Sequence, residues 1–167
     1  MPYQNFYNMK KFLLLLLLLL PLAITSCGGD DKDEPESTAN DPEGTIIANL
    51  SNTFHGIGNG YYEDGIDMYN TEGCLGLNSS NNLEAAGWYY GEIASIGKVK
   101  NLSSITKIPE TGWGSQVAAI PSYGYVYRFK DYYSDWRYAR IYVVDYIKNT
   151  SGGIIGVTIK YQKDWTP

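Results

Sequence analysis

An alternating segment near the C-terminus constrains the fold of this chain more than any other feature. In Tyr138–Ile147, every second residue is aliphatic apart from one aspartate, and the residues between are mostly aromatic, with one arginine. This period of two is typical of a β-strand, whose successive side chains point to opposite faces of a sheet. A second alternating run, 153–162, follows the turn Asn149–Gly153, and Tyr123–Phe129 precedes both. The pattern predicts a hairpin within a three-stranded meander.

The alternation also predicts which face of the strand 138–147 is buried. Its odd-numbered positions are aliphatic except for Asp145 and should face the core, whereas its even-numbered positions should form an outward ladder of aromatic residues with Arg140. A carboxylate on the inner face requires a partner if it is buried.

The rest of the folded region is also predicted to be β. From Gly44 onward the chain is rich in Tyr, Ile and Val and is interrupted by Gly, Asn and Pro, which favours short strands joined by turns. Further strands are expected at 45–50, 64–69, 73–78, 87–96 and 115–120. The predicted fold class is all-β, a compact antiparallel β-sandwich or small barrel of about 7–9 short strands in a single domain, 44–167.

The N-terminal residues 1–26 have the pattern of a signal peptide. Lys10 and Lys11 precede the apolar run Phe12–Leu20, which is shorter than the roughly 20 residues of a membrane-spanning helix. Met9 lies directly before the lysines and is the expected true start of translation.

The end of this leader carries a recognisable motif. The segment Ile24-Thr25-Ser26-Cys27 resembles the lipobox of bacterial lipoproteins, in which the cysteine thiol receives diacylglycerol before the signal is cut. The resemblance implies that lipid on Cys27 attaches the protein to a membrane, and stable attachment takes more than one acyl chain. The alternative is an ordinary cleavage after a small residue, with Cys27 unmodified.

The acidity of the chain belongs almost wholly to residues 28–43. This stretch has seven acidic residues and one lysine, whereas the 124 residues behind it carry 11 acidic and 10 basic ones. Its composition predicts a disordered linker, so the lipidated cysteine and linker together span 27–43. No basic patch is present, so nucleic acid is not an expected partner.

An acidic run directly after a lipidated cysteine resembles the surface-export signal of Bacteroides-type lipoproteins. It implies a lipid-anchored protein of the outer membrane that is exposed at the surface. A plain solvated spacer, with the domain on the periplasmic face, is the alternative.

The C-terminal half resembles an uncharacterised family of Bacteroides-type surface lipoproteins. The resemblance rests on GWGSQVA at 112–118, YARIYVVDYI at 138–147 and GGIIG at 152–156. It extends over roughly residues 44–162 and is closest from residue 96 onward. Because the family has no established activity, the resemblance supports the location and implies no catalytic residues.

Residues that support common catalytic or metal sites are scarce. His55 is the single histidine, and nothing places it beside Cys74 as the base that a cysteine or serine hydrolase requires. With Cys27 acylated no internal disulfide can form, so Cys74 is expected to be a small buried apolar residue. A zinc site needs about three ligands, and Glu63–Asp67 does not reproduce a calcium loop. We therefore expect no metal, no cofactor and no catalytic residues.

Aromatic residues are the strongest candidates for a binding site. The chain has 16 Tyr and 4 Trp, and an exposed ring suits stacking on a sugar or anchoring a protein interface. The alternative is that these rings are core or strand residues, and for Trp113, between two glycines, a packed turn is preferred. The candidate ligand-binding residues are Trp113, Asp131, Tyr132, Tyr133, Asp135 and Trp136.

The sequence as a whole predicts a membrane-anchored lipoprotein with a non-catalytic binding module. Its partners would be the membrane, through lipid on Cys27, and a glycan or protein at the cell surface. One alternative is a structural accessory lipoprotein of an envelope complex. Another is a glycan hydrolase that uses two carboxylates, although no spacing among the 11 acidic residues of the domain singles out a pair.

Overall fold

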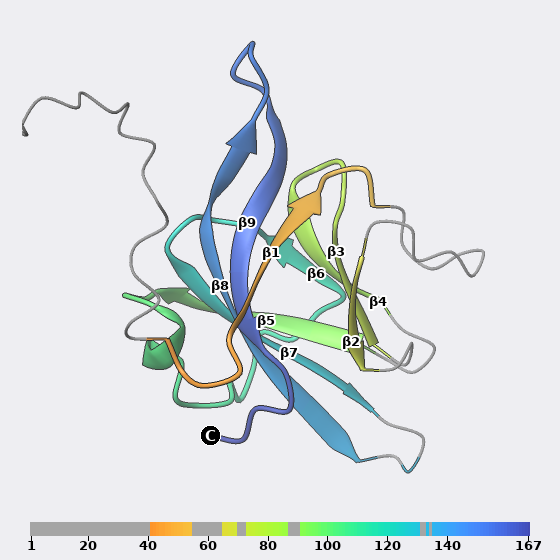
Figure 1. Ribbon diagram of the computed structural model, residues 1–167. Helices are drawn as coiled ribbons and strands as arrows, with labels where there is room; N and C mark the ends of the chain where they lie inside the picture. The colour runs from red at the N-terminus through yellow and green to blue at the C-terminus, as the bar shows by residue number, and fades with distance from the viewer. Residues whose placement is uncertain (1–40, 55–64, 70–72, 87–90, 131–132, 134) are drawn as a thin grey trace, which may run out of the picture. The chain divides into compact units, whose positions relative to one another are not determined.

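The computed structural model describes residues 41–54, 65–69, 73–86, 91–130, 133 and 135–167. These residues form two antiparallel sheets (Figure 1). The five-stranded sheet has the order β1-β9-β8-β7-β5, with bounds Ile46–Ser51, Ile154–Gln162, Trp136–Lys148, Tyr123–Lys130 and Gly91–Lys98. The four-stranded sheet has the order β2-β3-β4-β6, with bounds Ile66–Tyr69, Gly73–Leu77, Asn82–Ala86 and Gln116–Ala118. The predicted all-β class is confirmed, and because both sheets are open the arrangement is sandwich-like.

The main core lies between the inner faces of the two sheets. Leu75, Leu77 and Leu83 of the four-stranded sheet are fully buried in one cluster with Ile141 and Ile159 of the five-stranded sheet. Burial of side chains of this size contributes about 1.5–3 kcal/mol each, which makes the shared cluster the main source of stability.

The predicted meander is confirmed, and one strand at the centre of the chain was missed. Strands β7, β8 and β9 pair in sequence, as expected from their alternation. The strand expected at 87–96 corresponds to β5 at Gly91–Lys98, with residues 87–90 outside the described ranges, whereas β4 at Asn82–Ala86 was not predicted. The sequence Asn-Leu-Glu-Ala-Ala has low strand propensity. It is a strand because Leu83 and Ala85 pack in the core between β3 and β6.

A β-bulge in β8 reverses the faces that alternation predicts. The pairing of β8 with β9 is regular up to Val143 and resumes at Asp145, so Val144 is an extra residue. Before the bulge Ala139, Ile141 and Val143 are buried, as predicted, but after it Asp145 is exposed and Tyr146 packs against the core. Asp145 therefore needs no buried partner, and the prediction of one continuous inner face is wrong beyond Val143.

The outer face of the five-stranded sheet has its own apolar cover. The loop after β5 contains the 3-10 helix η3 (Leu102–Ser104), and a second cluster of buried residues comprises Leu102, Ile105, Val126 and Trp165. Tyr138 and Tyr142 of the predicted outward ladder are partly buried against this cluster. Both faces of β7 and β8 are thus apolar over part of their length.

The first described residues are fastened to β9 by a buried ion pair. Asp41 Oδ2 lies 2.8 Å from Lys160 Nζ, and the two side chains are only 7% and 9% exposed. Next to this pair, Gln162 Nε2 donates to the Glu43 carbonyl at 2.9 Å. The predicted signal peptide, Cys27 and most of the predicted linker lie outside the described residues. In the described ranges no helix has the length and apolar character needed to cross a membrane.

Candidate functional site

Arg128 on β7 lies between two tryptophan rings on the outer face of the five-stranded sheet. Its Cζ is 3.9 Å from the ring centroid of Trp113 and 4.4 Å from that of Trp136. Lys130 Nζ lies 5.2 Å from the Trp136 centroid. A guanidinium or ammonium over an indole is attracted by the negative face of the ring. These contacts hold the two indoles and Arg128 in one stack.

Strand register explains why Trp136 and Arg128 meet. Antiparallel pairing places Lys130 opposite Trp136 and Arg128 opposite Tyr138. Trp136 is therefore the diagonal neighbour of Arg128 on the same face of the sheet. Diagonal neighbours lie about 7–8 Å apart at Cα, which long and aromatic side chains can span.

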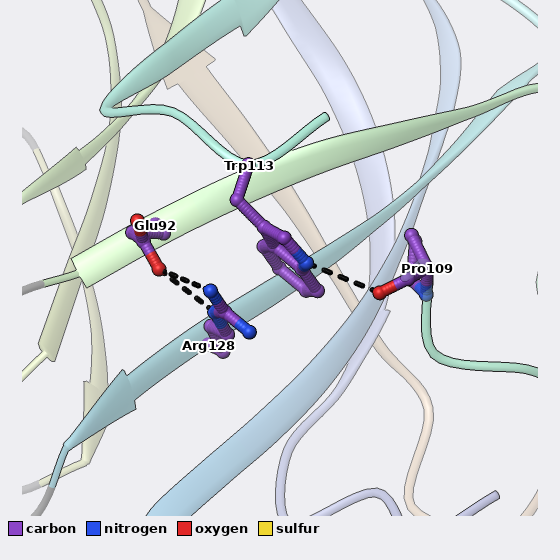
Figure 2. Close-up of polar contacts among 4 residues, drawn as sticks. All are labelled: Glu92, Pro109, Trp113 and Arg128. Atoms are coloured by element: carbon purple, nitrogen blue, oxygen red, sulfur yellow. Dashed lines mark hydrogen bonds and ion pairs between the residues drawn. The ribbon is translucent and has the colours of Figure 1, made fainter. Parts of the chain in front are cut away.

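Glu92 on β5 fixes the plane of the Arg128 guanidinium. It lies directly opposite Arg128 in the β5–β7 pair. Arg128 Nε donates to Glu92 Oε2 at 2.8 Å, and Nη2 lies 2.6 Å from the same oxygen (Figure 2). The side chains are 22% and 33% exposed, so solvent screens much of their attraction. The main consequence is geometric, because the paired guanidinium cannot rotate freely between the rings.

Trp113 reaches the stack from the loop that precedes β6. Its Nε1 donates to the Pro109 carbonyl at 3.1 Å, and its ring is half-buried against the second apolar cluster (Figure 2). The preceding Gly112 has φ +84, in the region that side-chain-bearing residues disfavour. Trp113 is thus partly packed, as the sequence favoured, but residues 112–114 do not form a regular turn, and the Trp113 ring also contacts Arg128.

We call Glu92, Trp113, Arg128, Lys130 and Trp136 the aromatic–arginine cluster. It contains two of the six candidate residues predicted from the sequence. A third, Tyr133, lies between β7 and β8 and is 82% exposed. Asp135 is also exposed, and Asp131 and Tyr132 lie outside the described residues.

Sequence reasoning missed Glu92, Arg128 and Lys130. The one signal available was the position of Arg128 in an alternating strand, between two odd-numbered core aromatics. That position predicts an outward side chain. It does not identify the strand that supplies the counter-charge, which comes from 36 residues earlier in the chain.

Cys74 is a buried structural thiol. Its side chain is 1% exposed, and burial, with a smaller contribution from Asp67, raises its pKa to about 11. A thiol with so raised a pKa is almost fully protonated at neutral pH and is a poor nucleophile. The expectation of a small buried apolar residue is confirmed.

The residues that could bind a metal ion fall into two groups. His55, Glu63 and Asp64 lie outside the described residues. Among the residues that the structure does describe, no group of three or more His, Cys, Asp and Glu could hold a metal ion.

The fold and the cluster define the class of this domain: an antiparallel two-sheet β domain that carries a stack of two indoles and a guanidinium on the outer face of its five-stranded sheet. The cavities at Arg140, about 360 Å³, and at Asp41, about 200 Å³, are lined by other residues. No family model, curated protein or solved structure matches the chain. Its function therefore has to be argued from its own residues.

Proposed function

We propose that this chain is a lipoprotein anchored in the outer membrane through Cys27, and that its β domain is a non-catalytic module that binds a glycan at the cell surface. The ligand would contact the aromatic–arginine cluster together with Tyr133. The observation that carries the proposal is the stacking of Arg128 between two indoles, one of which, Trp136, follows by three residues a tyrosine that is 82% exposed.

The rigidity of the cluster favours binding. Glu92, Pro109 and the strand pairing restrain Arg128 and Trp113 before any ligand arrives. A surface fixed in this way loses little side-chain entropy when a ligand docks. The two indoles are partly exposed and offer apolar edges to the apolar side of a sugar ring. Tyr133 adds a further ring with a hydroxyl group that can donate and accept hydrogen bonds.

The charges of the cluster support binding rather than hydrolysis. Glycoside hydrolysis generally requires two carboxyl groups that flank the scissile bond. Among its five members the cluster has one carboxylate, Glu92, and Arg128 engages its Oε2. The lipobox and the acidic linker support the location, because they would hold such a surface away from the membrane.

The test is a glycan panel probed with the full chain, solubilised in detergent if it carries lipid. We expect the wild type to bind at least one glycan and the double variant Tyr133→Ala, Trp136→Ala to bind it at least about tenfold more weakly, from the loss of two aromatic contacts. Thr150→Ala is the matched control, because Thr150 is exposed in the turn at the other end of β8.

Two results would count against the site. Equal binding by wild type and double variant would show that the ligand does not contact the cluster. No binding by the wild type to any glycan of the panel would contradict the glycan as ligand. A protein that co-purifies in stoichiometric amount, and is lost in the same double variant, would instead establish a protein partner. Thermal unfolding of each variant shows whether the fold is retained.

A further inference from the structure

A separate cavity lies at the C-terminal end of β9. It has a volume of about 360 Å³, and its walls include Ile105 after η3, Arg140 on β8, Gln162 at the end of β9, and Asp164 and Trp165 beyond it. Small-molecule sites typically have volumes of roughly 300–1,000 Å³. The cavity is therefore large enough for a small ligand, and we call it the Arg140 pocket.

Arg140 is held in place but keeps unused hydrogen-bond donors. Its Nε donates to Gln162 Oε1 at 2.8 Å, and its Nη1 donates to the Ile105 carbonyl at 3.0 Å. Gln162 is itself anchored, since its Nε2 donates to the Glu43 carbonyl. A guanidinium has five N–H donors. The N–H groups that do not take part in these two hydrogen bonds are available to a ligand.

The guanidinium of Arg140 also has no carboxylate partner among the described residues. The guanidinium lies over the ring of Trp165, whose centroid is 5.6 Å from Arg140 Cζ. Partial burial lowers the pKa of Arg140 from its ordinary value, in the direction expected for a charge that has lost water without gaining a counter-ion. An oxygen-bearing ligand in the pocket would restore the lost hydrogen bonds.

Asp164 provides the opposite chemistry in the same pocket. Its side chain is exposed at the rim, and it forms no ion pair with Arg140 in the described structure. A carboxylate only accepts hydrogen bonds, whereas a guanidinium only donates them. A small anion would be repelled by Asp164 and a small cation by Arg140. Hydroxyl groups can satisfy both, because each can accept from Arg140 and donate to Asp164.

We propose that the Arg140 pocket binds one neutral sugar residue, with hydroxyls that accept from Arg140 and donate to Asp164. Thr106 and Thr166, which also line the pocket, can provide further hydroxyl contacts. This proposal does not rest on the aromatic–arginine cluster, because the two sites share none of the residues that define them.

The proposal is tested by titrating the full chain with glucose, galactose, mannose and N-acetylglucosamine at millimolar concentrations, followed by NMR of the Trp165 indole N–H. We expect at least one sugar to bind and to shift this signal. Asp164→Asn should weaken the binding of that sugar about tenfold, because a charge-assisted hydrogen bond becomes a neutral one. Asp164 has φ +48, a conformation that asparagine also tolerates, so this variant should fold normally.

Two control variants establish whether the loss of binding is specific to the Arg140 pocket. Asp145→Asn makes the same change of charge at an exposed position on β8 and should leave sugar binding unchanged. The Tyr133→Ala, Trp136→Ala variant should also bind the monosaccharide normally. The proposals for the Arg140 pocket and for the aromatic–arginine cluster can therefore be contradicted independently. Acetate and glycine serve as probes for an anion site and for a zwitterion site.

Several outcomes would overturn the proposal. They are the absence of any sugar-induced shift, equal affinity of Asp164→Asn and Asp145→Asn for the sugar, and tighter binding of acetate or glycine than of every sugar. Acetate that binds more tightly after Asp164→Asn, with no sugar response, would identify an anion site instead.

Discussion

Two buried tyrosines of β7 connect the sheets through their hydroxyl groups. Tyr125 accepts a hydrogen bond from the Ile120 amide and donates to the Ala118 carbonyl, both at 2.8 Å. Tyr127 donates to the Ala86 carbonyl at 3.2 Å. Their rings fill the core while their hydroxyls satisfy backbone groups of the opposite sheet. Part of the tyrosine content of the chain is therefore structural rather than available for ligands.

Burial of Tyr125 and Cys74 predicts a loss of stability at alkaline pH. Burial raises the pKa of Tyr125 from 10.0 to about 12 and that of Cys74 from 9.0 to about 11. The unfolded chain ionises first, so the stabilisation from both neutral groups is complete below pH 9 and is lost as pH rises toward 12. We expect the free energy of unfolding, measured with urea at successive pH values, to fall across this range.

Variants at these positions assign the effect. Tyr125→Phe should lower stability at pH 7 by about 1–3 kcal/mol, because two backbone groups lose their partner, and should flatten the upper part of the pH profile. Tyr133→Phe is the control, since Tyr133 is 82% exposed, and should match the wild type. A profile that is flat from pH 9 to 12 in the wild type would show that the raised pKa values are wrong.

Which aromatic residues are buried could not be predicted from the sequence. Alternation distinguishes faces only when one face is polar, whereas β7 has Tyr125 and Tyr127 on its inner face and Val126 and Arg128 on its outer face. The outer face is covered by the loop around η3, so apolar residues occur on both sides. The covering depends on tertiary packing, which local periodicity does not encode.

The bulge at Val144 determines the direction of the last third of β8. Beyond it, Tyr146 turns inward and its hydroxyl donates to the Ala119 carbonyl at 2.9 Å. Asp145 turns outward, and its Oδ1 accepts from the Tyr146 amide at 2.7 Å. The extra residue thus places a tyrosine, rather than a carboxylate, on the core side of the strand.

Deletion of Val144 should restore regular register without changing which residues face the core. Asp145 would stay opposite Thr158 and Tyr146 opposite Val157, because the deleted residue is the one that has no partner on β9. We expect the free energy of unfolding to fall by no more than about 1 kcal/mol, as for Val144→Ala, which keeps the bulge. Urea denaturation of both variants measures these losses, and a loss of several kcal/mol on deletion alone would contradict the assignment of Val144 as the extra residue.

Elements with strong local signals were predictable, and elements defined by their neighbours were not. The β8–β9 hairpin follows from two alternating runs and a Gly-rich turn, in which Asn149 Oδ1 accepts from the amides of Ser151 and Gly153. Strand β4 has weak propensity and exists because of its packing. The bulge had one sequence signal, a single aspartate within an aliphatic row.

At the scale of the whole molecule, the proposed anchorage depends on Cys27. Replacement by alanine removes the thiol that would receive lipid, so Cys27→Ala should abolish labelling by a fatty-acid analogue and leave the protein uncut or released from the membrane. Labelling in cells followed by membrane fractionation measures both effects. Cys74→Ala, at the buried thiol, is the matched control and should retain label. Persistent labelling of Cys27→Ala would contradict the assignment.

The candidate site could be predicted only in part for a reason that also lies at this scale. Trp113 and Trp136 stand out as large aromatics next to turns, but their meeting at Arg128 requires β5, β7 and β8 to be neighbours in one sheet. Strand order depends on contacts between distant parts of the chain. The Arg140 pocket likewise combines the residues after η3, β8, and the end of β9 with the segment that follows it, and no local pattern indicates it.

The buried Asp41–Lys160 pair has a mechanical consequence for a tethered protein. If ligand binding at the surface loads the domain, tension from the proposed lipid anchor reaches the described residues first at Asp41. The ion pair, 2.8 Å long and almost inaccessible to water, then lies in series before the hydrogen bonds between β1 and β9. Separating two charges in such surroundings is costly. The pair should therefore resist the separation of the edge strand β1 from β9 under load.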